Sequence, residues 1–232
     1  MKEMKRSEIN RVIDWAIKTM EKFGYPLPPF AYYTPEDWKN LPADEQELVD
    51  NMLGWDITDF GSGDFDKVGL TILTLRNGNF FKKDQYPKPY AEKVLLVADG
   101  QILPYHFHWS KMEDIINRGG GDLQVWLYGS DENEQLSDAD VTVTIDGKKV
   151  TVPAGGSVTL KPGRSITLLP GQYHKWQGVP GTGDVVLYEV STTNDDCTDN
   201  RFYEVSGRLP AIEEDVAPSH LIFIDYKNYV NK

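Results

Sequence analysis

The chain has 232 residues, a formal net charge of −12 at pH 7 and a pI near 4.8. This acidic balance argues against nucleic acids and anionic membranes as partners. Hydrophobic residues make up 40% of the sequence, which is enough to build a core and excludes a disordered protein.

The cysteine content and the hydropathy pattern predict a compartment. Cys197 is the only cysteine, so a disulfide within the chain is excluded and a reducing cytoplasm is expected. It lies in the polar stretch 192–200, which contains no histidine, and we interpret it as an incidental thiol rather than a nucleophile. No apolar run reaches the length of a membrane span, and the N-terminus lacks the apolar core of a signal peptide. We therefore expect a soluble, cytoplasmic protein.

Residues 1–60 have mainly helical patterns and are predicted to form a helical extension packed on the rest of the chain. Residues 8–23 place apolar side chains at i, i+3, i+4 and i+7, as an amphipathic helix does. Ser7 is the predicted N-cap of this helix and Gly24 its predicted stop. Two further helices are predicted, one that begins at Thr34-Pro35 and one over 43–53.

From Lys67 onward, short apolar runs alternate with turn residues, which is typical of a sandwich or a barrel. Asp99-Gly100 and Asp146-Gly147 are the strongest hairpin turns, because both residue types tolerate the positive φ of a type I′ turn. We predict an all-β fold in which residues 61–232 form a β-barrel, with the helical extension as part of one structural domain. The predicted strands are 68–76, 91–98, 101–108, 123–128, 141–145, 148–152, 157–160, 165–169, 173–178, 184–191 and 220–225.

Three histidines and one glutamate in the β-rich region predict a metal site. His106 and His108 are two residues apart on a predicted strand, so their side chains point to the same face. Glu113 follows a predicted turn and its carboxylate can return to the same ion, while His174 needs only a neighbouring antiparallel strand. Three imidazoles and one carboxylate suit Mn²⁺, Zn²⁺, Co²⁺, Fe²⁺ or Ni²⁺, and Mn²⁺ is the ion we expect. The alternative is that His106 and His108 are ordinary strand histidines.

The spacing of these residues resembles the first sequence motif of the cupin superfamily. All fixed positions of that motif are matched, by Gly100, His106, His108, Glu113 and Gly120. The second cupin motif is similar to the stretch from Gly163 to His174. There Pro170 and Gly171 are adjacent, where the usual pattern separates them by one residue, and the usual final Asn is missing.

More narrowly, the chain resembles the D-lyxose isomerase family, whose members are ketol isomerases with a cupin fold. The resemblance is carried by residues 5–16, 106–115 and 202–204. It implies a cupin-type jelly-roll barrel of antiparallel sheets, a small sugar as substrate and a homodimer.

Two lysines are predicted to reach the metal site. If Asp99-Gly100 is a two-residue loop, Lys93 pairs with His106 across the hairpin and shares its face. A lysine buried there needs an anion or a polar ligand, which favours a functional role. The alternative is a register slip by one residue, which would turn Lys93 outward. Lys111 is assigned to the cavity by the family resemblance.

The remaining candidates are less constrained by the pattern. Alternation along the strand of His174 places Trp176 inside, as a wall against a sugar or as core filling, and sends Tyr173 and Lys175 outward. Glu204 stands among aromatic residues and is predicted to be a buried base with a raised pKa. Its alternative is an exposed ion pair with Arg201 or Arg208. The other polar candidates for substrate binding are Arg208 and Asp225.

The resemblance implies an aldose–ketose isomerase that interconverts D-lyxose and D-xylulose, and D-mannose and D-fructose as a further pair, through an enediol. In this hypothesis the metal stabilises the developing charge, Glu204 moves the proton, and Lys93 and Lys111 bind the hydroxyls and the carbonyl. The alternatives are an Fe²⁺-dependent cupin dioxygenase, which favours an apolar pocket, and a non-catalytic sugar-binding cupin. A phosphosugar isomerase needs a basic cluster, for which only Arg201 and Arg208 are candidates.

Overall fold

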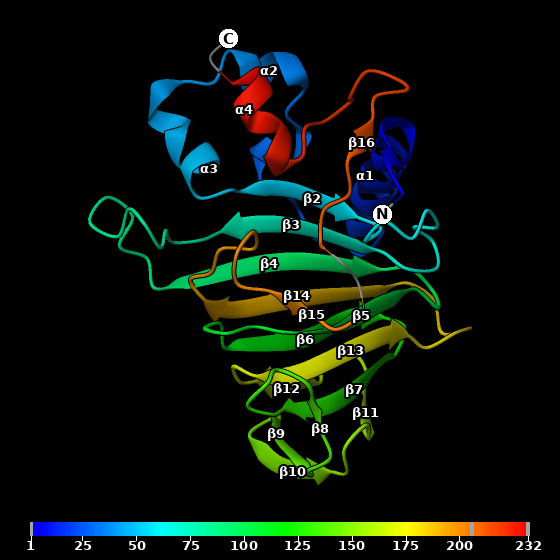
Figure 1. Cartoon of the computed structure of the whole chain (residues 1–232). Coiled ribbons are helices and arrows are strands. Elements are labelled where there is room, and N and C mark those ends of the chain that lie inside the picture. Colours follow the sequence, from blue (N-terminus) through cyan, green and yellow to red (C-terminus); the bar gives the residue numbers. More distant parts are fainter. Residues whose placement is uncertain (1, 205–206, 231–232) are drawn as a thin grey trace.

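The computed structural model describes residues 2–204 and 207–230, and these form two facing antiparallel sheets with helices gathered at one end (Figure 1). The larger sheet consists, in spatial order, of β10 (Lys148–Val152), β9 (Val141–Ile145), β12 (Ser165–Leu168), β6 (Glu113–Gly120), β14 (Val185–Thr192), β4 (Tyr90–Val97), β3 (Leu70–Arg76) and β2 (Gly54–Thr58). The smaller sheet consists of β11 (Ser157–Leu160), β7 (Leu123–Ser130), β13 (Gln172–Gly178), β5 (Ile102–Phe107) and β15 (Arg201–Phe202), and β8 (Leu136–Ser137) pairs with β7. The predicted all-β, antiparallel fold is confirmed.

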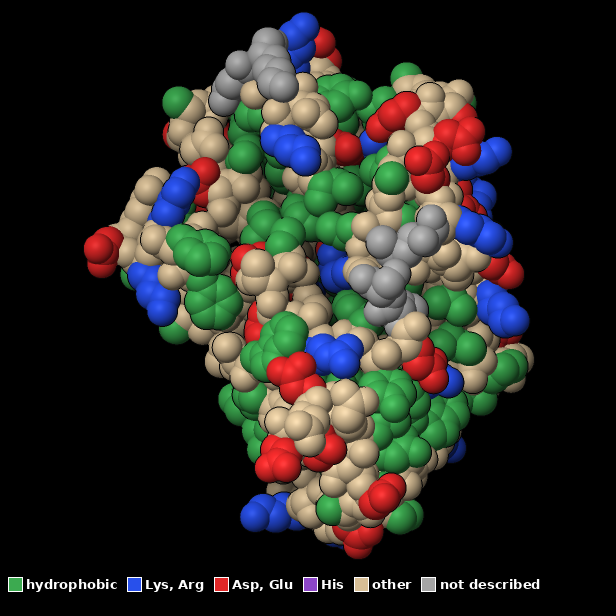
Figure 2. Space-filling model, viewed as in Figure 1, with side chains coloured by type: hydrophobic (Ala, Val, Ile, Leu, Met, Phe, Trp, Pro, Cys, Tyr) green, Lys and Arg blue, Asp and Glu red, His purple; other side chains and the backbone are tan. Residues whose placement is uncertain are grey.

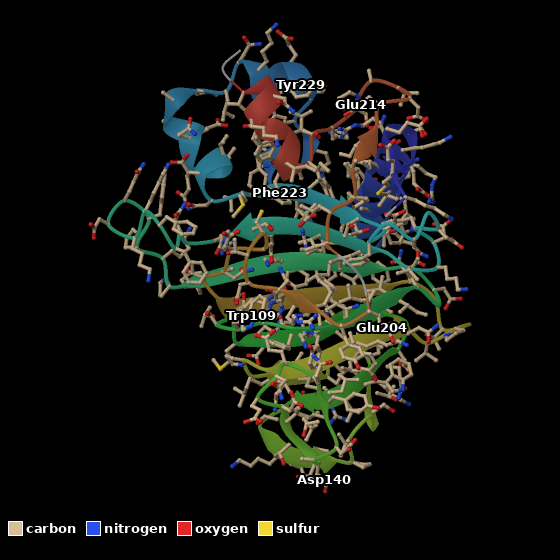
Figure 3. The ribbon with its side chains drawn as sticks, viewed as in Figure 1. Trp109, Asp140, Glu204, Glu214, Phe223 and Tyr229 are labelled. Carbon is tan, nitrogen blue, oxygen red and sulfur yellow. The ribbon has the colours of Figure 1, made fainter. Side chains whose placement is uncertain are left out.

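The helices cover one end and one outer face of the larger sheet. They are α1 (Arg6–Lys22), α2 (Pro35–Lys39), α3 (Gln46–Asp50) and α4 (Tyr226–Tyr229), with the 3₁₀ turns η1 (Pro29–Tyr32), η2 (Ala43–Glu45) and η3 (Phe223–Asp225). A short parallel pair joins β1 (Met4–Lys5) to β16 (Ile212–Glu213). Figure 3 shows Phe223 and Tyr229 among these helices and Asp140 at the opposite end of the molecule. None of the described helices is long and apolar enough to cross a membrane.

The side chains of strand β4 alternate between the two faces of the larger sheet. Leu95 and Val97 belong to the core between the sheets, whereas Val94 and Leu96 pack with the apolar stripe of α1. Because side chains alternate along a strand, Lys93 lies on the same side as Leu95 and Val97. Its side chain is fully buried. The alternation of β4 therefore places the Lys93 side chain between the two sheets.

Several expected elements differ in the structure. β2 and β6 were not predicted, because each mixes polar residues with glycine or with consecutive apolar residues. The strand predicted over 220–225 is wrong: Asp225 accepts the backbone N–H of Ile222 at 3.0 Å and closes a 3₁₀ turn there. The helix predicted over 43–53 is divided into η2 and α3 and ends at Asp50.

The predicted helix ends had mixed outcomes. Ser7 is inside α1 rather than its N-cap, because its hydroxyl donates to Asp215 at 2.6 Å and the cap position is Lys5. Gly24 follows the helix with φ +69°, as a glycine stop does. The capping box of Thr34 with Asp37 is confirmed.

Arg6 joins α1 to the C-terminal segment through a buried ion pair. Its side chain is fully buried, and its guanidinium donates to both carboxylate oxygens of Asp225 at 2.9 Å and to Glu214. Arg6→Ala is expected to lower the free energy of unfolding by about 3–5 kcal/mol, because it leaves the Asp225 carboxylate buried without its cation. Urea denaturation followed by circular dichroism measures this change.

Arg11→Ala is the matched control on the same helix. The side chain of Arg11 is half exposed and pairs with the exposed Asp66, so its loss is expected to cost less than about 1 kcal/mol. Equal losses in the two variants would show that the Arg6 pair does not hold the terminal segments together.

Candidate metal centre

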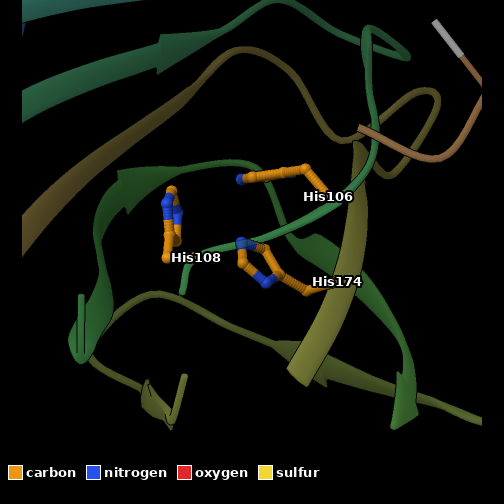
Figure 4. Close-up of side chains that lie close together, drawn as sticks. All are labelled: His106, His108 and His174. Carbon is orange, nitrogen blue, oxygen red and sulfur yellow. The ribbon is translucent and has the colours of Figure 1, made fainter. Parts of the chain in front are cut away.

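The three predicted histidines meet between the two sheets. His106 on β5 pairs directly with His174 on β13, and His108 follows the end of β5. All three are buried, and one ring nitrogen from each lies within 4.8 Å of the others (Figure 4). Glu113 begins β6 in the opposite sheet, and its Oε1 lies 3.1 Å from His174 Nε2 and 3.7 Å from His108 Nε2. The structure therefore brings the four predicted ligands together.

Backbone carbonyls fix the tautomer of each ring. The Nδ1 atoms of His106, His108 and His174 lie 3.1, 2.6 and 3.0 Å from the carbonyl oxygens of Pro104, Asp199 and Gln172. Because a carbonyl only accepts, each Nδ1 carries a proton, and Nε2 is the nitrogen of each ring that is available to a metal ion. Burial lowers the pKa of His106 well below its usual value, and burial together with Lys111 lowers the pKa of His108 to about 3. These two rings are neutral at pH 7, as a metal ligand must be.

The same atoms need a cation between them. Within the described ranges, Nε2 of His108, Nε2 of His174 and Oε1 of Glu113 are buried and have no hydrogen-bond partner. Each is an acceptor, so their close approach is unfavourable unless a positive charge lies among them. A divalent ion satisfies all of them at once. The donor set of three imidazoles and one carboxylate fits Mn²⁺ and its neighbours in the first transition row.

Charged side chains continue from the metal ligands across the cavity. Lys111 Nζ lies 2.6 Å from Glu113 Oε2 and 2.9 Å from Glu189 Oε1, and Lys93 Nζ lies 3.4 Å from the same Glu189 oxygen and 2.8 Å from Asp196. Burial alone would lower the pKa of Lys111, but the carboxylates of Glu113 and Glu189 outweigh it and raise that pKa above its ordinary value. Lys111 is therefore a permanent donor rather than a base.

Farther from the metal ligands, the same cavity ends in a second ion pair. Arg208 is bonded to Asp56 of β2, and both side chains are buried. Burial would raise the pKa of Asp196, but Lys93 and Arg208 together hold it below its ordinary value. Trp176 and Phe202 supply apolar walls between these charged groups.

Comparisons with known proteins show the family of the chain. A family model described as D-lyxose isomerase matches residues 4–226. The chain is 45% identical over 228 residues to a D-lyxose/D-mannose isomerase of Serratia proteamaculans, and the matched region covers 98% of this chain and 100% of that protein. It is also 45% identical over 227 residues to the D-lyxose/D-mannose isomerase of Escherichia coli O157:H7, with 97% of this chain and 100% of that protein covered. The chain belongs to the D-lyxose isomerase family.

Solved structures show the same fold at much lower identity. An L-ribose isomerase of Cellulomonas parahominis is 17% identical, with a TM-score of 0.61 over 92% of this chain and 100% of that chain. The L-ribose isomerase of Geodermatophilus obscurus gives the same values. The predicted family and enzyme class are confirmed: this member of the D-lyxose isomerase family is a sugar isomerase.

Lys93 reaches the cavity by a different route from the predicted one. The predicted cross-strand pair with His106 is wrong, because β4 and β5 lie in different sheets even though Gln101 donates its N–H to Ala98 O at 2.9 Å in the turn between them. Lys93 pairs instead with Glu189 of β14. It still points inward because the two sheets face each other. Lys111 also lies inside, as the resemblance implied.

The other predicted residues separate into two groups. Trp176 and Arg208 line the cavity. Lys175 lies over the rings of Tyr105 and Trp126 on the outer face. Tyr173 points the same way, but it is fully buried and donates its hydroxyl to Glu134 O at 2.7 Å.

Two candidates lie elsewhere. Glu204 is exposed, so the burial predicted for it is wrong; it follows β15 by two residues and is not among the residues that line the cavity. Asp225 is buried, but its carboxylate is bonded to Arg6 on the helical side of the sheet rather than to cavity residues.

Sequence reasoning missed two carboxylates of the cavity, and one of them had a signal. In β14, Val185 and Leu187 belong to the core between the sheets, so alternation places Glu189 on the same inward face. A glutamate on the apolar face of a strand is a signal of a buried carboxylate. Asp196 lies in an irregular segment, and no pattern of the sequence predicts its position.

A third missed residue, Asp199, holds the metal-ligand turn. Its carboxylate accepts the backbone N–H groups of Ser110 and Lys111 at 3.0 Å, while its carbonyl accepts from His108. One residue thus fixes both a ligand and the cavity lysine. Its contacts depend on tertiary structure alone.

Removal of one ligand is expected to abolish tight metal binding. His174→Ala should weaken Mn²⁺ binding at least about a hundredfold, since it removes an inner ligand of a four-donor set. Equilibrium dialysis of chelator-treated protein measures the affinity. In the unaltered protein, Mn²⁺ at 100 times its Kd should also stabilise the fold by about 2.7 kcal/mol.

His220→Ala is the control, because His220 is the fourth histidine of the chain and bonds Tyr33 O among the helices. It should leave the Mn²⁺ affinity unchanged. If both variants bind Mn²⁺ like the unaltered protein, the histidine cluster is not the metal centre.

Proposed function

We propose that this protein is a metal-dependent isomerase that interconverts D-lyxose with D-xylulose and D-mannose with D-fructose. The names of the two curated relatives support these substrates. The buried cluster of His106, His108 and His174, with the Glu113 carboxylate beside it, supports a divalent ion. We propose Mn²⁺ as the first choice among Mn²⁺, Zn²⁺, Co²⁺, Fe²⁺ and Ni²⁺.

The reaction moves one proton from C2 to C1 and another between the two oxygens. The ion, when bound, acts as a Lewis acid that stabilises negative charge on the substrate oxygens. Glu189 is the residue we assign to the carbon-bound proton, because its carboxylate is buried and lies on the same cavity as the metal ligands. Lys111 is held protonated and donates to a substrate oxygen as charge develops there. Lys93 holds Glu189 in place at 3.4 Å.

The observation that carries this mechanism is the charged lining of a buried cavity. Lys111, Glu189, Asp196 and Arg208 are too many charged groups for an oxygenase pocket, which is lined mainly by apolar side chains. Hydroxyl groups of a sugar match these donors and acceptors. Glu189 replaces Glu204 as the proposed proton carrier because Glu204 is exposed.

The assembly and compartment are proposed on other grounds. A homodimer follows from the family resemblance of the sequence. A cytoplasmic location agrees with the single cysteine.

Metal dependence of turnover is the first test. Chelator-treated protein supplied with D-lyxose is expected to form D-xylulose only after Mn²⁺ is added, and to consume no dissolved oxygen. Ketose formation and an oxygen electrode follow both quantities in one sample. Oxygen uptake, or D-xylulose formation at full rate without any metal, would contradict the proposal.

Substitution of the proton carrier tests the mechanism. Glu189→Gln keeps the shape of the side chain but removes its basicity, so kcat should fall at least about a hundredfold while Mn²⁺ binding is retained. Solvent deuterium should appear at C1 of the D-xylulose formed by the unaltered enzyme. Glu204→Gln, the matched control, should keep kcat within about twofold. A Glu189→Gln variant with normal kcat, or a product free of deuterium, would remove Glu189 from the role.

A further inference from the structure

The cavity beside the metal ligands is too small for a sugar. Its volume is about 20 Å³, which is room for roughly one water molecule. Pockets that hold small organic ligands have volumes of about 300 Å³ or more. An aldose must therefore occupy additional space next to this inner cavity.

A second pocket provides that space. This outer pocket has a volume of about 290 Å³ and is lined by Asp196, Cys197, Asn200, Arg201, Phe202, Gly207 and Arg208. Four of these residues, Asp196, Asn200, Phe202 and Arg208, also line the inner cavity. The face shown in Figure 2 is hollowed near its centre, and Lys or Arg side chains are visible in the recess. These four shared residues form the wall between the two spaces.

We propose that the outer pocket is a sugar subsite, in which a neutral aldose ring binds first and from which it reaches the metal ligands through the shared wall. This inference rests on the proposed isomerase function and extends it to a specific place on the molecule. The outer pocket supplies the volume that the inner cavity lacks, and the sugar's reacting end passes inward while its tail stays outside.

Unpaired donors mark the route. The Arg208 side chain is 8% exposed, and its Nη1 has no hydrogen-bond partner among residues 2–204 and 207–230. Trp176 Nε1, deeper in the cavity, is likewise buried and unpaired within the same ranges. A buried donor without an acceptor is unfavourable. Sugar hydroxyl oxygens satisfy both groups.

The wall is held by contacts that a polyhydroxyl ligand can replace. Asp196 accepts from Lys93 at 2.8 Å and from Asn194 Nδ2 at 2.7 Å, and Asn200 donates to Asp196 O. Phe202 closes the remaining gap by stacking on His106, with ring centroids 5.1 Å apart. When the wall opens to admit the sugar, the sugar's hydroxyl groups form hydrogen bonds in place of those between Asp196 and its neighbours.

Charge balance selects a neutral sugar over a sugar phosphate. Arg208 is neutralised by Asp56, and Arg201 lies 3.3 Å from Glu134. Asp196 adds a further carboxylate to the lining. A phosphate needs surplus cations, and this pocket has none among its described residues.

Cys197 is a built-in probe of the outer pocket. It is the only cysteine in the chain, and it is exposed on the pocket lining. Partial burial and the neighbouring Asp195 raise the pKa of its thiol to about 11, so maleimide labelling should be slow and is best run near about pH 8.5. Mass spectrometry of the intact chain follows the adduct.

Two results are expected. D-lyxose at saturating concentration should slow labelling of Cys197 at least about fivefold, whereas mannose 6-phosphate at the same concentration should protect less. A bulky fluorescein maleimide on Cys197 should lower kcat/KM at least about tenfold, and N-ethylmaleimide should lower it less. Treatment with either maleimide should not change the activity of the Cys197→Ser variant, because that variant has no thiol to label. Circular dichroism of the labelled protein checks that the fold is intact.

The outcomes separate this proposal from the proposed function. The outer subsite is overturned, and the isomerase left intact, if the unlabelled enzyme converts D-lyxose but D-lyxose does not slow labelling of Cys197 and the adduct does not lower kcat/KM. Protein that forms no ketose with any of the metals, yet is protected by D-lyxose, overturns the isomerase and keeps the subsite. Stronger protection by the sugar phosphate overturns the choice of a neutral ligand.

A second variant tests the subsite without chemical labelling. Arg201 lines the outer pocket but not the inner cavity, so Arg201→Ala should raise KM for D-lyxose about fivefold with little change in kcat. Arg164→Ala is the matched control, because Arg164 pairs with exposed Asp146 away from both pockets. An unchanged KM in Arg201→Ala would remove Arg201 from the subsite.

Discussion

Buried carboxylates have to be paired with cations, and this constraint organises the interior of the barrel. Glu113, Glu189 and Asp196 alternate with Lys111 and Lys93, and all but Asp196 are nearly inaccessible to solvent. Loss of one member would leave its neighbour as an uncompensated buried charge. Three carboxylates against two ammonium groups leave one negative charge in the interior, which is the environment a divalent ion requires. With such an ion the balance becomes positive by one charge, and that favours the negative charge that develops on a substrate oxygen.

The ligands come from both sheets, so the site also ties the two layers together. His106 and His174 belong to the smaller sheet, whereas Glu113, Lys93 and Glu189 belong to the larger one. A metal ion or a salt bridge in this position crosses the interface between the sheets. Metal binding should therefore be coupled to the stability of the whole domain rather than to a local loop. The neutral tautomers required for binding are fixed by backbone carbonyls and so need no movement when the ion binds.

The sequence predicted which residues gather at the candidate metal centre better than it predicted the groups around them. Histidines two apart on a strand, and a fixed spacing to Glu113, are local patterns that alternation and motif spacing can read. Lys93 was placed inside by a cross-strand argument that does not apply, since its strand and that of His106 lie in different sheets; it is inside because the sheets face each other. Glu189 had a readable signal on an alternating strand. Glu204 lies in a segment without periodicity. The apolar run that ends at Asp225 was predicted as a strand, but the Asp225 carboxylate closes a 3₁₀ turn there and binds Arg6.

The division into an inner cavity and an outer pocket has a consequence for specificity. The two proposed substrates, D-lyxose and D-mannose, have the same configuration at the reacting carbon C2, so under the proposal the inner residues bind what the two sugars have in common. The two sugars differ in chain length at the far end, which is the part that the proposed subsite would receive. Asp196 and Arg208 line both spaces. Because Asp196 also pairs with Lys93, a residue that contacts the bound sugar also holds a charged group beside the inner cavity. A substitution in this wall should therefore change rate and selectivity together, whereas one confined to the outer lining should change selectivity alone.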